Sequence, residues 1–84
     1  MIIVKVLFFA TLRDLAGVHG IDLELPEGCT VEEMKYHLVE SMPILTKSIP
    51  TAVVAVNHEF AFDQDVLGDG AELALFPPVS GGAS

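Results

Sequence analysis

The sequence contains very little cysteine and few basic residues. Its single cysteine, Cys29, excludes an internal disulfide bond, which is compatible with a reducing compartment. Only 4 lysines and arginines stand against 12 acidic residues, and the formal net charge is -8. A surface of this sign repels phosphate backbones and anionic lipids, so we expect neither nucleic acid nor membrane as a partner. The charge suits a basic protein partner, or it only keeps the chain soluble.

Long apolar runs and known catalytic motifs are also missing. No apolar stretch reaches the ~18–20 residues of a membrane span, and no basic segment precedes the first apolar run as in a signal peptide, so we expect a cytoplasmic protein. Phosphate-binding loops, nucleophile elbows and dinucleotide fingerprints are absent from the sequence. His19, His37 and His58 have no partners at a metal-ligand spacing, so we expect no metal site.

Cys29 precedes the start of a predicted helix. Such a position can lower the pKa of a thiol and make it reactive. The simpler interpretation, which we favour, is a half-buried structural thiol. The adjacent Glu32 and Glu33 are explained by helix capping without catalysis.

The length and hydropathy of the chain indicate one small globular domain. It has 84 residues, of which 51% are hydrophobic and 19% charged. A chain of this size buries roughly 60–65% of its unfolded surface, which is enough for one core but too little for an enclosed active site. We therefore predict a domain over residues 1–78, a flexible tail over 79–84, and no catalytic activity in the isolated chain.

Five segments have the pattern of β-strands. Residues 2–9 are apolar except for Lys5, which indicates a central strand covered on at least one side, and residues 21–25 alternate strictly between apolar and acidic. The first two strands are close enough in sequence to be antiparallel neighbours. Three further strands are expected at 52–56, 59–62 and 71–76.

Two segments have helical features. Residues 10–16 form a short helix or turn closed by Gly17. The main helix begins with a capping box at Thr30 and Glu33 and ends before Pro43, and a loop follows to residue 50. An apolar stripe at helical spacing would pack on the sheet; it consists of Val31, Met34, Leu38 and Met42. The expected fold is α+β: a mixed five-stranded sheet on one main helix, as in the ubiquitin-like β-grasp fold.

The C-terminal segment is the part of the sequence best suited to a function. Pro77 and Pro78 stiffen the chain after the last strand, since their φ angles are fixed near the extended region. Gly81 and Gly82 have no Cβ atoms and can pass through a channel too narrow for side chains. From Pro77 to Gly82 the chain reaches at most roughly 20 Å. A frayed end without function is the alternative.

Nearly the whole chain, from about residue 2 to 82, resembles the sulfur-carrier (small) subunits of molybdopterin synthase. The resemblance lies in three segments: Val-Lys-Val-Leu-Phe-Phe-Ala at 4–10 with Leu-Arg-Asp-Leu-Ala-Gly at 12–17, Val-Ala-Val-Asn at 54–57, and residues 67–82, which end in Phe-Pro-Pro-Val-Ser-Gly-Gly. The ending is specific, whereas the rest would fit β-grasp proteins in general.

The resemblance implies chemistry at the tail. An activating enzyme, an adenylyltransferase and sulfurtransferase, would use ATP to adenylylate the carboxylate of Gly82, and sulfur would then replace AMP to give a thiocarboxylate. The tail, with Gly81 as its slim neighbour, would enter a large catalytic subunit and give sulfur to a pterin precursor, forming the dithiolene of molybdopterin. A heterotetramer of two small and two large subunits is implied, and no cofactor would be bound permanently by the chain.

The resemblance also implies partner-contacting residues. They are Phe9, Arg13, Phe76, Pro77, Pro78, Val79 and Ser80. Core packing would explain Phe9 and Phe76 equally simply, and a surface ion pair would explain Arg13. For Phe76 partner contact is favoured, because it lies where the last strand releases the tail and because interfaces are enriched in aromatic residues.

The sequence departs from the family at its last two residues. The family's chains end at the second glycine, whereas this sequence continues with Ala83 and Ser84. Either a protease removes these two residues, or they are a remnant of cloning, or the carrier function has been lost; the intact Gly-Gly makes the last the least favoured.

Two other kinds of function stay open. A related β-grasp carrier could act as a ubiquitin-like protein modifier or in thiazole synthesis, although the Phe-Pro-Pro ending argues against the thiazole pathway. A ubiquitin-like interaction domain with an inert tail is the third possibility, and it would be unaffected by deletion of residues 81–84.

Overall fold

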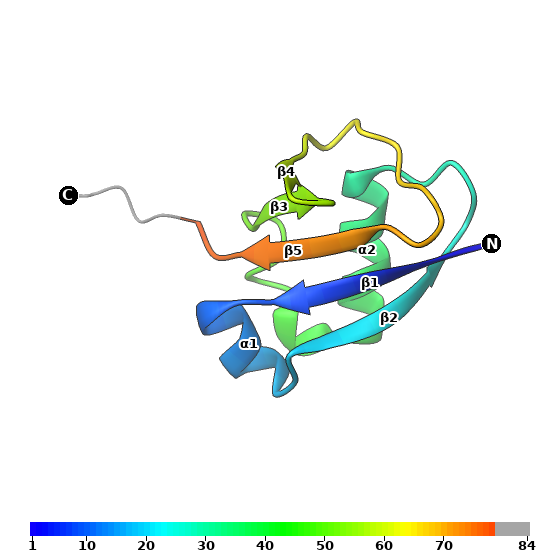
Figure 1. Ribbon diagram of the computed structural model, residues 1–84. Helices are drawn as coiled ribbons and strands as arrows, with labels where there is room; N and C mark the ends of the chain where they lie inside the picture. The colour runs from blue at the N-terminus through cyan, green and yellow to red at the C-terminus, as the bar shows by residue number, and fades with distance from the viewer. Residues whose placement is uncertain (79–84) are drawn as a thin grey trace.

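The computed structural model describes residues 1–78. Within them, five strands form one sheet: β1 (Ile2–Phe8), β2 (Gly20–Leu25), β3 (Val53–Val56), β4 (Glu59–Phe60) and β5 (Glu72–Phe76). Their order is β2-β1-β5-β3-β4 (Figure 1). β1 and β5 are parallel and the other neighbours are antiparallel, so the predicted mixed sheet and the pairing of its first two strands are confirmed.

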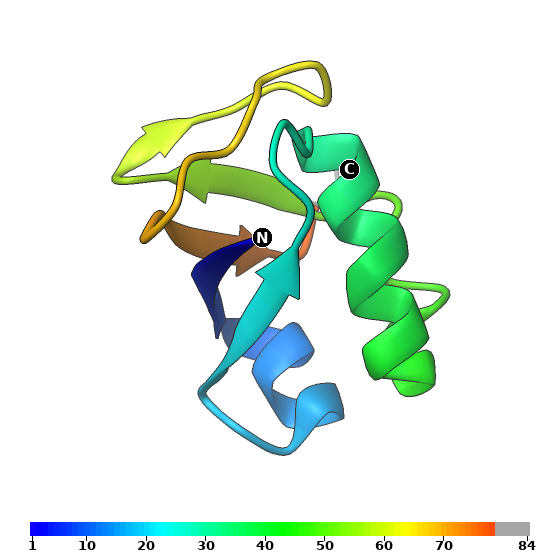
Figure 2. The ribbon, with the colours of Figure 1, turned by 90° about the vertical axis from the view of Figure 1, so that its right-hand side faces the viewer.

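The helices are α1 (Ala10–Ala16) and α2 (Val31–Ser41), and a short 3₁₀ helix, η1 (Pro43–Leu45), lies in the region expected to be a loop. Figure 2 shows α2 against one side of the sheet. This arrangement is the expected β-grasp fold. We call the side of the sheet opposite α2 the outer sheet face. None of the helices in residues 1–78 has the length and apolar character needed to cross a bilayer.

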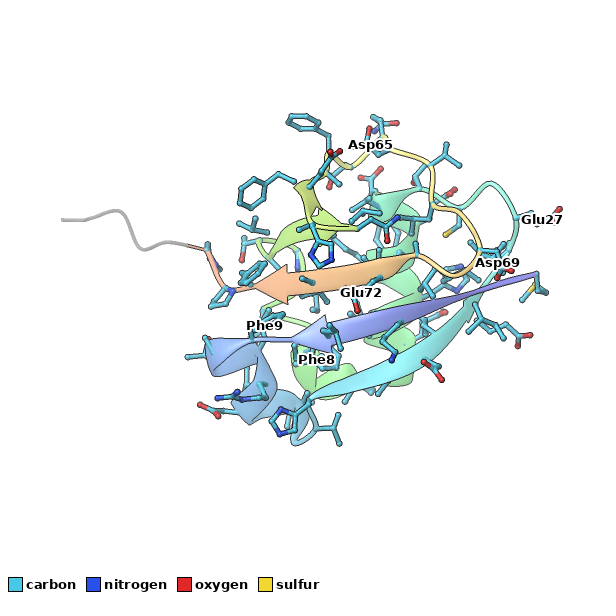
Figure 3. All side chains as sticks on the ribbon, in the orientation of Figure 1. Phe8, Phe9, Glu27, Asp65, Asp69 and Glu72 are labelled. Carbon is cyan, nitrogen blue, oxygen red and sulfur yellow. The ribbon has the colours of Figure 1, made fainter. Side chains whose placement is uncertain are left out.

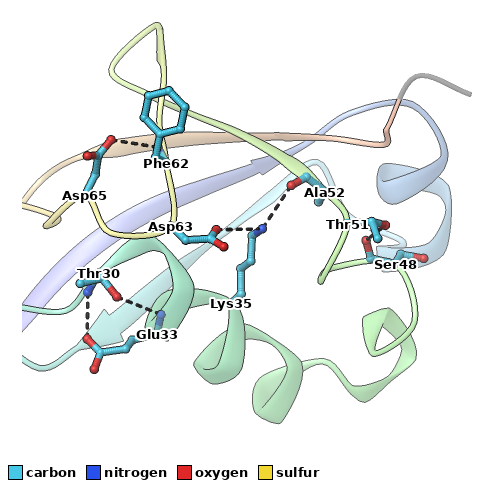
Figure 4. A network of polar contacts seen from close by, with 9 residues as sticks. All are labelled: Thr30, Glu33, Lys35, Ser48, Thr51, Ala52, Phe62, Asp63 and Asp65. Atoms are coloured by element: carbon cyan, nitrogen blue, oxygen red, sulfur yellow. Dashed lines mark hydrogen bonds and ion pairs between the residues drawn. The ribbon is translucent and has the colours of Figure 1, made fainter. Parts of the chain in front are cut away.

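The start of α2 follows from its sequence. The Glu33 amide donates to Thr30 Oγ1 at 3.2 Å, and the Thr30 amide donates to Glu33 Oε1 at 3.0 Å (Figure 4). This capping box satisfies two amides at the helix start. The helix ends at Ser41, before Pro43, as predicted.

The core lies between α2 and the sheet. Of the predicted helix stripe, Val31, Met34 and Leu38 are buried, whereas Met42 is half-buried and packs at the edge of the core. In β1 every second side chain from Ile2 to Phe8 is buried, and Ile3 on the outer sheet face is 53% exposed. The first strand is therefore covered on one side only.

The element boundaries differ from the predictions by one or two residues. Phe9 is not the last residue of a strand but the N-cap of α1, although its backbone is extended with φ of -124°. The second strand begins at Gly20, one residue early, because Gly20 pairs with Leu7. The other strands are shorter than expected, since the sheet pairing covers only 53–56, 59–60 and 72–76. The prediction for Gly17 is confirmed: it ends α1 with φ of 76°.

Gly20 is required because β1 passes very close to it. A Cβ atom at this position would lie 2.6 Å from the Val6 carbonyl oxygen and 2.8 Å from Leu7 Cδ2. The carbonyl belongs to a strand backbone and cannot move away easily. We expect Gly20→Ala to lower the free energy of unfolding by about 1–3 kcal/mol, measured by urea denaturation.

Gly68 provides the matched control for Gly20. A Cβ atom there would have no neighbour within 4 Å. Gly68→Ala is therefore expected to change stability by less than about 0.5 kcal/mol. An equal loss at both positions would show that the close approach at Gly20 is not the cause.

Candidate functional site

Two phenylalanine rings lie together where β1 and β5 end. Because the two strands are parallel, both finish at the same end of the sheet, beside α1 (Figure 1). The rings of Phe9 and Phe76 are stacked there, with centroids 4.8 Å apart and planes 14° apart. Phe9, which Figure 3 labels at the end of β1, is 37% exposed. Phe76 is half-buried, so the pair is open to solvent instead of being part of the core.

The backbone around Phe9 fixes the position of this pair. The Phe9 amide donates to the Leu75 carbonyl at 3.1 Å, which joins the end of β1 to the end of β5. The Phe9 carbonyl accepts from the Leu12 amide at 3.1 Å and so begins α1. Ala10, the first residue of α1, has a positive φ of 53°, an uncommon conformation for alanine. This sharp turn holds Phe9 against β5.

The stacked pair forms one side of a shallow groove on the outer sheet face. The groove has a volume of about 330 Å³ and is mainly apolar. Its lining residues are Leu7, Phe9, Ala55, His58, Phe60, Glu72, Ala74 and Phe76. Of these lining residues, the sequence analysis predicted only Phe9 and Phe76 as partner contacts. We call this groove, with the aromatic pair, the aromatic groove.

Phe60 also lines the aromatic groove, with 76% of its surface accessible. The sequence analysis did not identify it as a candidate site residue. It pairs with Ala55 across the β3–β4 hairpin, which places it on the same face as Ala74 and Phe76. The position of Phe60 could have been predicted from the two-residue turn at Asn57 and His58, because such a turn sets the register of the two strands.

The hairpin turn is attached to β5. Asn57 and His58 both have positive φ angles, of 50° and 75°. The Glu72 amide donates to Asn57 Oδ1 at 3.0 Å, and the Asn57 amide donates to the Glu72 carbonyl at 2.8 Å. His58 Nε2 lies 3.7 Å from Glu72 Oε1 at the groove rim. The turn residues therefore hold Phe60 and His58 beside β5.

The other predicted partner residues fall at this end of the molecule or beyond the described residues. Arg13 is exposed on α1 and forms no ion pair within residues 1–78, so the alternative of a surface ion pair is not supported. Pro77 is half-buried and Pro78 exposed, directly after β5. The predictions for Val79, Ser80, Gly81 and Gly82, and for the tail as a whole, lie outside the described residues.

Cys29 is a structural residue, as favoured from the sequence, but it is fully buried in the core and not half-buried as predicted. Its side chain is 2% exposed, and its thiol donates weakly to the Thr30 carbonyl at 3.6 Å. Burial, and secondly the carboxylate of Glu33, raise the pKa of this thiol. The less favoured alternative, a thiol activated by the helix start, is contradicted, because desolvation opposes the thiolate here.

The buried thiol of Cys29 leads to a labelling prediction. At pH 7.5 we expect iodoacetamide to modify the native chain at least about 100-fold more slowly than the chain in 6 M guanidinium, since a buried, raised-pKa thiol forms little accessible thiolate. The rate is read by intact mass. Equal rates in the two states would show that the native thiol is accessible.

The described residues contain no arrangement typical of side-chain catalysis. No polar or charged side chain is buried among residues 1–78. His19 is exposed, His37 lies 3.9 Å from Glu40, and His58 lies beside Glu72, so the three histidines are on separate elements. Within the same residues no group of three or more His, Cys, Asp or Glu could hold a metal ion. What this region can offer is an apolar contact surface next to the start of the tail.

Comparison with known proteins gives consistent similarities over nearly the whole chain. The model of the ThiS family matches residues 6–82. The protein named molybdopterin synthase sulfur carrier subunit in Chlamydomonas reinhardtii is 40% identical over 81 residues, which cover 94% of this chain and 98% of that protein. The protein with the same name in Escherichia coli K12 is 34% identical over 83 residues, with 94% and 99% covered.

Solved structures show the same fold. A putative molybdopterin converting factor subunit 1 from Pyrococcus furiosus superposes with a TM-score of 0.85 at 30% identity, covering 94% of this chain and 100% of its own. The small archaeal modifier protein 1 of Haloferax volcanii has a TM-score of 0.85 at 28% identity, with the same coverage. A complex of subunits 1 and 2 of a molybdopterin-converting factor from Helicobacter pylori matches with a TM-score of 0.68 at 21% identity, covering 96% and 100%, and supports the fold alone.

Proposed function

The chain belongs to the ThiS family, and from this premise we propose that it carries sulfur on its C-terminal glycine in the synthesis of molybdopterin. The resemblance noted in the sequence is confirmed by curated relatives named as sulfur carrier subunits of molybdopterin synthase. The proposal assigns the chain the role of a non-catalytic subunit, whose large partner subunit supplies the reacting pocket.

One observation carries this proposal. The solvent-open stack of Phe9 on Phe76 lies directly before Pro77 and Pro78, and the sequence then leads to Gly81-Gly82 within a few residues. A partner that covers the aromatic groove would thus receive the glycine pair at the edge of the contact. Exposed aromatic pairs of this kind are typical binding anchors, and the net charge of -8 favours a basic partner.

The chemistry proposed for the tail starts from the carboxylate of Gly82, once Ala83 and Ser84 have been removed. A carboxylate is a poor electrophile. Its oxygen attacks the α-phosphorus of ATP on an activating enzyme, pyrophosphate leaves, and the product is an acyl adenylate. Hydrosulfide then attacks the acyl carbon, AMP departs with the electrons of the broken C–O bond, and loss of the S–H proton leaves a thiocarboxylate. The isolated domain needs only to present this end, since binding by the partners supplies orientation and charge stabilisation.

Deletion of residues 81–84 tests the carrier role. The aromatic groove is formed by residues within 7–76, so the shortened chain is expected still to bind the large subunit through this groove. It should nevertheless fail to restore molybdoenzyme activity in cells that lack the small subunit. Full activity of the shortened chain would instead support an interaction domain with an inert tail.

Protein modification is a second candidate function, because a small archaeal modifier shares the fold at 28% identity. The same acyl adenylate could acylate a lysine amine, with loss of AMP. Digested cell extract should then contain branched peptides in which a lysine carries the last residues of this chain. Their absence, together with formation of a thiocarboxylate, would favour the sulfur carrier alone.

A further inference from the structure

A second groove lies on the side of the molecule opposite the aromatic groove. It has a volume of about 510 Å³ and runs between α2 and the segment 46–50 that follows η1. Because α2 covers the other side of the sheet, a partner on the outer sheet face would leave this groove free (Figure 2). We call it the α2 groove.

The floor of the α2 groove is apolar. Ile49 is fully buried beneath it, Val39 is half-buried, and Pro50 forms part of the opposite wall. Tyr36 stands at the groove with 66% of its surface exposed. Tyrosine with this exposure beside an apolar floor is a common anchor in protein interfaces, because the ring adds contact area and the hydroxyl stays hydrated.

One wall of the groove is held rigidly by polar contacts. Lys35 Nζ donates to the Ala52 carbonyl at 3.3 Å and lies 3.5 Å from Asp63 Oδ1 (Figure 4). The Glu32 amide donates to the Asp63 carbonyl at 3.0 Å, which fastens the loop around residue 63 to the start of α2. These contacts hold the wall in place. Among residues 1–78 the only Lys or Arg that lines the groove is Lys35, and Asp63 already neutralises it.

Two further carboxylates leave the groove negatively charged. Glu32 and Glu40 line it from the same face of α2, eight residues apart, which is about 12 Å along the helix axis. Within residues 1–78, Glu32 has no ion pair, and the carboxylate of Glu40 is near only His37 Nδ1, at 3.9 Å. Lys47 belongs to the neighbouring segment but does not line the groove.

From this combination we propose that the α2 groove binds a basic amphipathic segment of a protein partner. Apolar side chains of the segment lie on Val39, Ile49 and Tyr36, and two arginines or lysines reach Glu32 and Glu40. Helices that bind in grooves use this pattern of apolar anchors flanked by charge. Nucleic acid and anionic lipid lack the required positive charge. This site would let a partner hold the chain while the aromatic groove and the tail engage another protein.

The test uses the full chain and a synthetic helical peptide with two arginines eight positions apart and leucines between them. Amide spectra of ¹⁵N-labelled chain are recorded during titration. We expect shifts in α2 and in residues 46–50, and at least about tenfold weaker binding by Glu32→Lys/Glu40→Lys, since each lost pair becomes a repulsion. Glu32 lies in the first turn of α2, where a lysine also disfavours the helix. Glu40→Lys and Tyr36→Ala are therefore measured singly as well, and each should weaken binding.

The matched control is Asp22→Lys/Glu24→Lys, which changes the net charge equally but on the outer sheet face of β2. It should leave the dissociation constant within about twofold, since the charges are far from the groove and screened by salt. A peptide with glutamates in place of the arginines should not bind. Shifts on the outer sheet face, equal weakening by the control variant, equal binding of both peptides, or no binding at millimolar peptide would each overturn the proposal. The test does not use Gly81 or Gly82, so its result is independent of the carrier function.

Discussion

Replacement of Phe76 by lysine is expected to weaken binding to the large subunit by about 100-fold or more, which corresponds to roughly 2.7 kcal/mol. The substitution removes one ring of the stacked pair and places a charge in the mainly apolar aromatic groove. Burying that charge without a partner adds to the loss of contact area. Titration calorimetry with the purified large subunit measures the effect.

Ile3→Lys is the matched control for Phe76. Ile3 is also on the outer sheet face and exposed, but it lies at the opposite end of β1 from Phe9. The same change of charge there should alter the affinity by less than about threefold. Thermal unfolding of both variants checks that the fold is retained. If both substitutions weaken binding equally, the aromatic groove is not the centre of the contact.

The second large effect is expected at the glycine pair. In a chain that ends at Gly82, Gly81→Val should lower the rate of thiocarboxylate formation by about 100-fold or more, because a β-branched side chain widens the tail and restricts its backbone. The buried core is built from residues between Ile2 and Leu75, so the stability of the domain should not change. Single-turnover assays with ATP and the activating enzyme provide the rate.

A valine elsewhere separates this effect from a general loss of function. Gly68→Val places the same side chain at a position where a Cβ atom has no neighbour within 4 Å. This variant should be activated at the normal rate. A normal rate for Gly81→Val as well would mean that the tail does not pass through a narrow channel.

Local sequence features predicted most of the fold correctly. The capping box of Thr30 and Glu33, the stop at Pro43 and the alternation in 21–25 each depend on neighbouring residues, and all three have the expected structure. The errors have two causes. Gly20 joins β2 only because the distant strand β1 lies beside it. Phe9 leaves its strand for a local reason, since the positive φ of Ala10 turns the chain into α1, and no residue type in the sequence indicates that turn.

Only part of the candidate site could be predicted, because its geometry depends on segments that are far apart in the sequence. Phe9 and Phe76 were identified through the resemblance, but their stacking depends on a parallel pairing of strands that are more than sixty residues apart in the chain. Phe60 could have been placed from the hairpin register, since the turn at Asn57 and His58 pairs Ala55 with Phe60. The α2 groove could not, because its two walls meet only after the chain has turned at η1.

The most direct test of the account is the intact mass of a chain ending at Gly82 after incubation with ATP, the activating enzyme and a sulfur donor. The account predicts a gain of about 16 Da, the exchange of one oxygen for sulfur, localised to Gly82, and no gain for a chain that ends at Ser84. An unchanged mass, or a gain of about 32 Da localised to Cys29 as a persulfide, would contradict it.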